Sequence, residues 1–369
     1  MASATAVAKL APNDPRVEYK DVQVNGRSYH YMLARPPAGA EPRATILLVH
    51  GFPDLGFGWR HQVPALAAHG FQVVVPDVLG YGGTDAPHDV EPYRHKSVID
   101  DLLAVLDSQD LIVPLGPTRE RRVVLGGHDW GGQVVWRFTE WHPDRVAATF
   151  SVCTPYFPPM PSFVDLQTLT RMIPNFKYQL QFASDEVVDR TTGPDGKPSR
   201  ADIRNFLNAL WGGVGVPQTG APDAPRGFTA SNGVDFSIVK DLPRTQLLSA
   251  EELDFYADRY ARNGMRGPTN WYRVRKVNFE DEQALLERKR KQAEETGGEP
   301  KIKTPSLFIS ASRDVALPPA MSANMDKSFE SLTRGHVDAS HWALVEAAAE
   351  VNAIILSFLD SVFKPKASM

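Results

Sequence analysis

The chain has 369 residues, of which 42% are hydrophobic and 23% charged, and its formal net charge is −4. This composition is ordinary for a globular protein and gives no basic stripe of the kind that binds nucleic acid. A single cysteine, Cys153, excludes an internal disulfide framework. No apolar run is long enough to span a membrane, and the N-terminus lacks a secretory signal pattern, so we expect a cytoplasmic protein.

The first predicted elements are the two strands of a hairpin. Residues 22–24 and 28–32 alternate in strand fashion about Asn25-Gly26, a favoured two-residue turn. Continuous apolar runs, typical of strands buried on both faces, follow at 46–49, 71–75, 123–125 and 146–152. Helical patterns lie between them, at 59–68, at 98–106 and around Trp136. This alternation predicts an α/β fold with a mostly parallel sheet flanked by helices.

The alternation stops near residue 156 and resumes at the apolar run 306–309. Between these points the chain has helix-like patches, many prolines and glycines, and a charged stretch at 287–291 that we interpret as a solvated helix face. So long an insertion in an α/β sheet predicts a mainly helical cap domain. We therefore expect a core formed by residues 1–155 and 304–369 and a cap formed by residues 156–303.

The strongest motif is Gly-His-Asp-Trp-Gly-Gly at 127–132, between a predicted strand and a predicted helix. This is the setting of a nucleophile elbow, with Asp129 where serine is common. Side chains at Gly127 and Gly131 would clash in such a turn, and the helix N-terminus favours an ionised carboxylate. An ionised Asp129 can displace a leaving group from saturated carbon and form an alkyl ester. The substrate should then carry an epoxide oxygen or a halide.

Two further motifs supply the groups needed to hydrolyse such an ester. His-Gly-Phe-Pro at 50–53 follows a buried strand, so the Phe52 amide is expected to join the Trp130 amide in an oxyanion hole. His341 follows the last predicted strand, near 332–337, and would be the general base. Asp314 follows the strand at 307–310 and would orient His341.

The other histidines have plainer interpretations. His50 and His128 are expected to shape the loops of the site, and no His-Glu-x-x-His or Cys/His cluster predicts a metal. The proposed steps require no cofactor.

At these positions the sequence resembles the soluble, cap-bearing epoxide hydrolases of the α/β-hydrolase fold. The likeness covers most of the chain and rests on residues 50–53, 59–66, 77–82, 127–132, 266–273 and 341–342. In this family two cap tyrosines donate hydrogen bonds to the epoxide oxygen. Tyr272, within Asn-Trp-Tyr-Arg, and Tyr178, within Tyr-Gln-Leu-Gln-Phe, match them, although the family often has a second tyrosine where this chain has Gln181.

The resemblance implies conversion of epoxides to vicinal diols with water, through an ester on Asp129. The alternative is a haloalkane dehalogenase, which shares the fold and the aspartate but does not need Tyr272 and Tyr178. A fluoroacetate dehalogenase is disfavoured because Trp130 stands where that group prefers arginine. A non-catalytic ligand receptor on the same fold is a further alternative. The sequence is compatible with a monomer or a homodimer, and it selects neither the epoxide nor its enantiomer.

Overall fold

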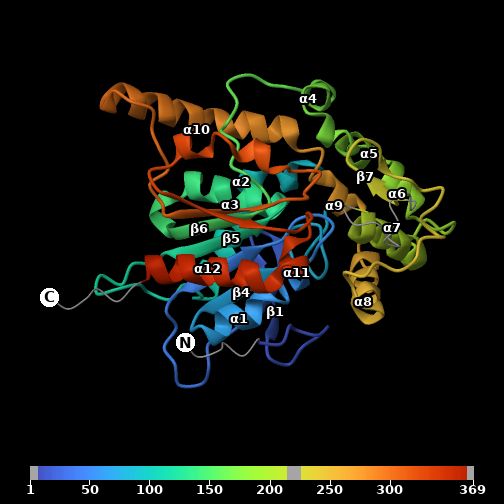
Figure 1. The fold of residues 1–369 in the computed structure, drawn as a ribbon, viewed down its shortest axis with the longest axis horizontal. Coiled ribbons are helices and arrows are strands. Elements are labelled where there is room, and N and C mark those ends of the chain that lie inside the picture. Colours follow the sequence, from blue (N-terminus) through green and yellow to red (C-terminus); the bar gives the residue numbers. More distant parts are fainter. Residues whose placement is uncertain (1–6, 214–225, 364–369) are drawn as a thin grey trace.

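The protein is built around an eight-stranded sheet in the computed structural model, which describes residues 7–213 and 226–363 (Figure 1). The strand order is β1-β2-β4-β3-β5-β6-β9-β10. The pairings β1–β2 and β2–β4 are antiparallel, and the others in this sheet are parallel. The strands are β1 Glu18–Val24, β2 Arg27–Ala34, β3 Thr45–Val49, β4 Gln72–Pro76, β5 Val123–His128, β6 Val146–Val152, β9 Ser306–Ala311 and β10 Leu332–Val337.

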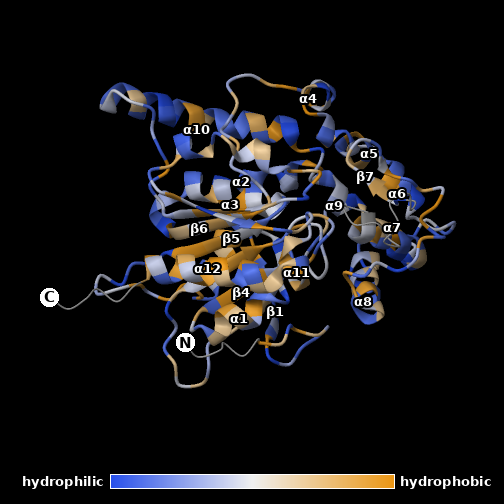
Figure 2. Cartoon of the chain, in the orientation of Figure 1, coloured by the Kyte–Doolittle hydropathy of each residue, from blue (hydrophilic) through white to orange (hydrophobic). Residues whose placement is uncertain are grey.

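Helices cover both faces of this sheet. Helices α1 and α12 lie on one face, and α2 and α3 lie on the other (Figure 1). These core helices are α1 Gln62–Ala68, α2 His95–Ser108, α3 Trp130–Trp141, α11 Ala343–Glu346 and α12 Ala348–Val362. Every residue of β3, β4, β5 and β6 is buried, and Figure 2 shows this central part as hydrophobic. Burial on both faces explains the continuous apolar runs and confirms the predicted α/β architecture.

The predicted hairpin is confirmed, whereas one predicted helix begins later than expected. Strands β1 and β2 are joined by Asn25 and Gly26, whose φ angles of 48° and 77° are those of a tight hairpin turn. The helix expected from Trp59 begins only at Gln62, because residues 56–59 form a 3-10 turn. Pro64 lies in the first turn of α1, where no helical hydrogen bond from its nitrogen is needed.

The segment between β6 and β9 is mainly helical, as expected. Its elements are α4 Leu166–Met172, α5 Tyr178–Ala183, α6 Glu186–Arg190, α7 Arg200–Gly213, β7 Phe228–Thr229, β8 Gly233–Val234, α8 Ala250–Ala261, α9 Arg266–Asn270 and α10 Arg275–Thr296. Strands β7 and β8 form a small antiparallel pair that the sequence did not indicate. Among the helices of the two described ranges, none is long and apolar enough to cross a membrane.

Helix α10 runs along the outside of α2 and α3 (Figure 1). In its charged stretch Glu287, Arg290 and Lys291 are exposed, so the predicted solvated face is confirmed for them. Lys289 differs, because its ammonium group lies 2.6 Å from the buried Glu140 carboxylate and 2.8 Å from the Tyr156 hydroxyl. Lys289 therefore anchors α10 to α3, a contact that a pattern of charges cannot reveal.

Candidate active site

The turn that carries Asp129 has the geometry of a nucleophile elbow. Asp129 lies between β5 and α3 with a φ of 54°, a strained value for a non-glycine residue. A Cβ atom on Gly127 would lie 2.3 Å from the Gly131 oxygen, and one on Gly131 would lie 2.0 Å from the Val49 oxygen. Both glycines are therefore needed for β5 and α3 to meet in this turn.

The other predicted groups lie on neighbouring loops at the same edge of the sheet. Phe52 follows β3, Asp314 follows β9 and His341 follows β10. The carboxyl ends of parallel strands share one edge, so residues far apart in the chain converge there. The sheet order thus brings Phe52, Asp314 and His341 to Asp129.

The loop after β3 contacts the Asp129 carboxylate directly. The Phe52 amide donates a hydrogen bond of 2.7 Å to Asp129 Oδ1, and the peptide bond between Phe52 and Pro53 is cis. His50 shapes this loop as expected, because its Nε2 accepts a 3.0 Å hydrogen bond from the Val78 amide. The Trp130 amide belongs to the first residue of α3, directly after the nucleophile.

His341 lies between two carboxylates. Its Nδ1 is 2.8 Å from Asp314 Oδ2, and its Nε2 is 3.6 Å from Asp129 Oδ2. Asp314 also accepts hydrogen bonds of 2.9 Å from the amides of Ala316 and Leu317. Burial alone would raise the Asp314 pKa, but His341 and these amides hold it below its ordinary value.

The same carboxylates determine the charge of His341. Burial by itself lowers the pKa of His341, but Asp314 and Asp129 outweigh burial and raise it to about 10. His341 is therefore an imidazolium at neutral pH as long as Asp129 is an ionised carboxylate. Any reaction that neutralises Asp129 removes one of the two negative charges that stabilise the protonated ring of His341.

Tyr178 and Tyr272 lie close to each other in the part of the structure around Asp129. Tyr178 begins α5, Tyr272 follows α9, and their ring centroids are 6.2 Å apart. Both line the same cavity as Asp129. Burial is the main cause that raises the pKa of each phenol, so both stay protonated at neutral pH and can donate.

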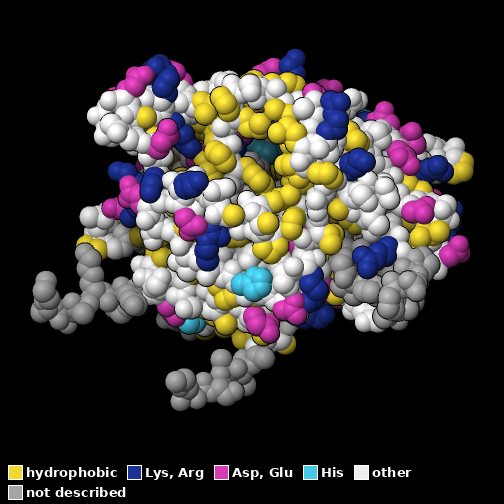
Figure 3. All heavy atoms as spheres, turned by 45° about the horizontal axis from the view of Figure 1, so that its top comes forward, with side chains coloured by type: hydrophobic (Ala, Val, Ile, Leu, Met, Phe, Trp, Pro, Cys, Tyr) yellow, Lys and Arg dark blue, Asp and Glu magenta, His cyan; other side chains and the backbone are white. Residues whose placement is uncertain are grey.

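The cavity has a volume of about 410 Å³ and a mostly apolar lining. Asp129 and the two tyrosines lie at its inner part, and its outer part reaches the exposed side chains of Met160, Phe163 and Met172. Figure 3 shows hydrophobic side chains around a hollow on this side of the molecule. Such a cavity suits an apolar small molecule.

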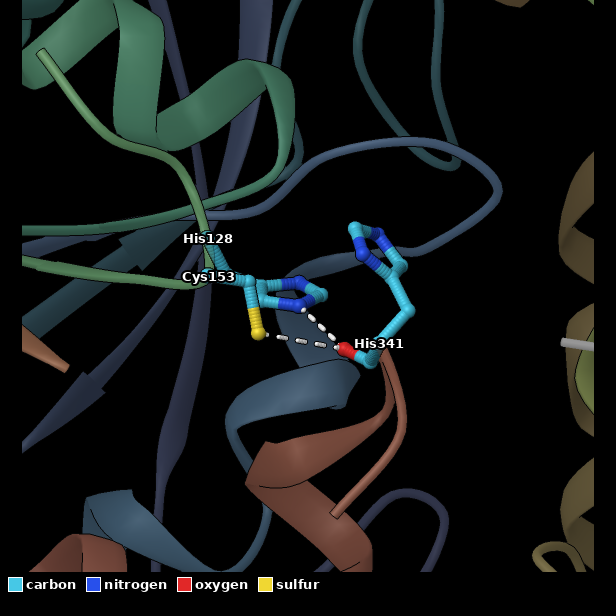
Figure 4. Close-up of side chains that lie close together, drawn as sticks. All are labelled: His128, Cys153 and His341. Carbon is cyan, nitrogen blue, oxygen red and sulfur yellow. Dashed lines mark hydrogen bonds between the residues drawn. The ribbon is translucent and has the colours of Figure 1, made fainter. Parts of the chain in front are cut away.

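His128, Cys153 and His341 form a buried group of side-chain types that can bind transition metals. The His341 ring lies close to the His128 ring in Figure 4, with a centroid distance of 4.8 Å, but its Nδ1 and Nε2 contact Asp314 and Asp129. His128 Nε2 and Cys153 Sγ instead reach the backbone oxygen of His341, at 2.8 Å and 3.6 Å. Burial lowers the pKa of His128 to about 4, so its ring is neutral and can donate through Nε2. We interpret this group as support for the His341 backbone.

Trp211 on α7 contacts the loops of the candidate site, a role that the sequence analysis missed. Its ring stacks on Trp342, next to His341, with a centroid distance of 3.6 Å. Its indole nitrogen donates to the Pro53 oxygen at 3.3 Å, and the Trp342 indole donates to the Leu210 oxygen at 3.2 Å. Trp211 therefore connects the inserted segment to the loops of both Phe52 and His341. No motif or spacing could have revealed a contact between such distant parts of the chain.

Comparison with known proteins identifies the family of this chain. Residues 44–348 match the family model of the α/β hydrolase fold. The chain is 36% identical to an epoxide hydrolase of Neurospora crassa, with 95% of this chain and 97% of that protein covered. It is 32% identical to epoxide hydrolase A of Mycobacterium tuberculosis, covering 87% and 92%. Its match to the mouse bifunctional epoxide hydrolase 2, at 32% identity, spans 56% of that longer protein.

Solved structures of epoxide hydrolases also match the fold of this chain. Epoxide hydrolase A of Mycobacterium thermoresistibile superposes with a TM-score of 0.71 at 29% identity, covering 93% of this chain and 98% of that one. The fold and the elbow place the protein among the hydrolases of the α/β hydrolase fold. Within that fold the chain belongs to the epoxide hydrolases, which confirms the resemblance seen in the sequence.

Proposed function

We propose that the protein opens epoxides to vicinal diols through a covalent alkyl ester on Asp129. The observation that carries this proposal is that a carboxylate and two protonated tyrosines line one mostly apolar cavity. The nucleophile and the proton donors that an epoxide-opening reaction needs thus line the same space. We also assign residues 156–303 as the cap, because this segment supplies Tyr178 and Tyr272.

In the first step Asp129 attacks one epoxide carbon, and the bond from that carbon to the epoxide oxygen breaks. Tyr178 and Tyr272 donate hydrogen bonds to the departing oxygen, and one of them gives it a proton. The negative charge of Asp129 is consumed in the ester, so the His341 pKa falls and its proton restores the tyrosine. The products of this step are an alkyl ester with a free hydroxyl and a neutral His341.

In the second step the neutral His341 takes a proton from water, and the hydroxide attacks the ester carbonyl of Asp129. The amides of Phe52 and Trp130 stabilise the oxyanion of the tetrahedral intermediate. The intermediate releases the second hydroxyl of the diol, and Asp129 is again a carboxylate. His341 ends as the imidazolium from which the cycle began, so protons and charges balance.

Isotope labelling in a single turnover tests this route. Excess protein is mixed with styrene oxide in ¹⁸O-labelled water. The protein is then digested, and the mass of the peptide that carries Asp129 is measured by mass spectrometry. Label should enter Asp129, while the first diol should contain mostly unlabelled oxygen. Label found only in the diol would mean direct attack by water. Halide release from a chloroalkane without any diol from an epoxide would instead favour the dehalogenase alternative.

The two cavity tyrosines give a second test. Tyr272→Phe or Tyr178→Phe should each lower kcat/KM for an epoxide by roughly 10²-fold, because general-acid assistance to the leaving oxygen is lost. The loss should appear in the rate of ester formation, measured by rapid mixing. Tyr156→Phe is the matched control, because its hydroxyl bonds Glu140 at 2.7 Å and it does not line the cavity. An equal loss in Tyr156→Phe, or none in Tyr272→Phe, would contradict the assignment.

A further inference from the structure

The outer wall of the cavity carries an unusual concentration of exposed apolar side chains. Five large hydrophobic side chains are exposed in the described part of the chain, and four of them lie between residues 160 and 180. Three of these four, Met160, Phe163 and Met172, also line the cavity and are named the apolar rim. Met172 is the most exposed of them, at 66%. Single exposed apolar residues are ordinary, but a cluster around a cavity marks an interaction surface.

The apolar rim is continuous with the interior of the cavity. Met160, Phe163 and Met172 line the same space as Asp129. Phe163 also packs against Phe279 of α10, with ring centroids 5.5 Å apart, so both sides of the opening are apolar. The path from the rim to the nucleophile is therefore mostly apolar, although Arg137, Arg275 and Glu282 also line it.

Basic side chains flank the apolar rim. Arg171 and Lys177 are exposed, and Lys276 is exposed but lies 3.9 Å from Glu280, whereas Asp281 and Glu282 of α10 pair with arginines of the core. Asp165, the acidic residue of α4, caps the start of that helix by accepting from the Thr168 amide. An apolar surface edged by cations complements a bilayer whose headgroups are anionic.

We propose that the apolar rim docks on an anionic phospholipid surface, from which lipophilic epoxides enter the cavity. A protein partner on the rim would close the opening, whereas a lipid surface extends the apolar path into the acyl region. The protein would dock on the membrane surface without spanning it, since the rim is formed by a loop and the short helix α4. This inference goes beyond the proposed reaction, because lipid binding can be measured without turnover.

Vesicle flotation tests the proposal. The full chain is mixed with vesicles of phosphatidylcholine alone, or of phosphatidylcholine with phosphatidylserine, and the bound fraction is measured. The protein should bind both and should bind the anionic vesicles more strongly. Met172→Asp should weaken binding about tenfold, because a charge replaces an inserted apolar side chain. The double variant Arg171→Glu/Lys177→Glu should bind vesicles of phosphatidylcholine as before, but it should bind the vesicles with phosphatidylserine no more strongly than those.

Val7→Asp is the matched control, because Val7 is 46% exposed but does not line the cavity. It should bind vesicles like the unaltered protein. If Met172→Asp fails to fold, Met160→Asp makes the same test, because Met160 is exposed and lines the cavity. Failure of the unaltered protein to float with either vesicle, or equal losses in Val7→Asp and Met172→Asp, would overturn the proposal. A dimer that Met172→Asp dissociates, without vesicle binding, would show that a second copy covers the rim.

Discussion

Replacing Asp129 with asparagine is expected to lower the rate of diol formation by at least ~10⁴-fold. An amide has no negative charge with which to attack carbon, although it fills the same space and can still accept from the Phe52 amide. The rate is measured as diol formed from styrene oxide at saturating substrate. Asp144→Asn is the control, since Asp144 is an exposed aspartate in the turn after α3. Turnover of the Asp129 variant near the original rate would mean that another group attacks the epoxide.

The Asp129→Asn variant also tests the electrostatic role of the nucleophile. Asp314 and Asp129 together raise the His341 pKa to about 10. Removing one negative charge destabilises the imidazolium, so the pKa of His341 should fall in the variant. The ring is then protonated at low pH and becomes neutral at a lower pH than in the original protein. An NMR titration of His341 measures this, and an unchanged pKa would show that Asp129 does not hold its proton.

Replacing His341 with glutamine is expected to stop the reaction after one alkylation. Asp129 can still open the epoxide, but no base activates the water that must hydrolyse the ester. Steady-state kcat should fall by ~10⁴-fold or more, while a stoichiometric adduct accumulates on the protein. Mass spectrometry of the intact chain after mixing with styrene oxide would show one added substrate mass per protein.

The control for this variant is His88→Gln, which alters an exposed histidine. It should turn over normally and show no lasting adduct. Steady turnover by His341→Gln at the original rate would remove His341 from the role of base. A folded variant that neither turns over nor becomes alkylated would show that His341 acts before the ester forms.

Those residues of the candidate site that lie in a local motif, or directly after a strand, could be predicted from the sequence. The glycines around Asp129 are required by close backbone contacts, so they form a motif that can be read without a structure. Asp314 and His341 each follow a strand, and parallel strands deliver their carboxyl ends to one edge. Predicted strands therefore sufficed to bring three distant residues together.

Long-range side-chain contacts could not be predicted in this way. The pattern of charges predicts that Lys289 is solvated, and only the packing of α10 shows that it reaches Glu140. The start of α1 was misplaced because a 3-10 turn and an α-helix share their apolar spacing over one turn. The apolar rim could not be predicted either, because the composition along the chain does not show which apolar side chains are exposed.

The stack of Trp211 on Trp342 limits how this protein can be recombined with its relatives. In a chimaera, a foreign cap without an indole at this position would leave Trp342 unstacked and the Pro53 oxygen without its donor. The loops of His341 and Phe52 would lose a common support even though every reacting residue was retained. Exchange of the proposed cap therefore has to transfer Trp211 together with its two core partners, and the exchanged unit crosses the boundary proposed for the cap.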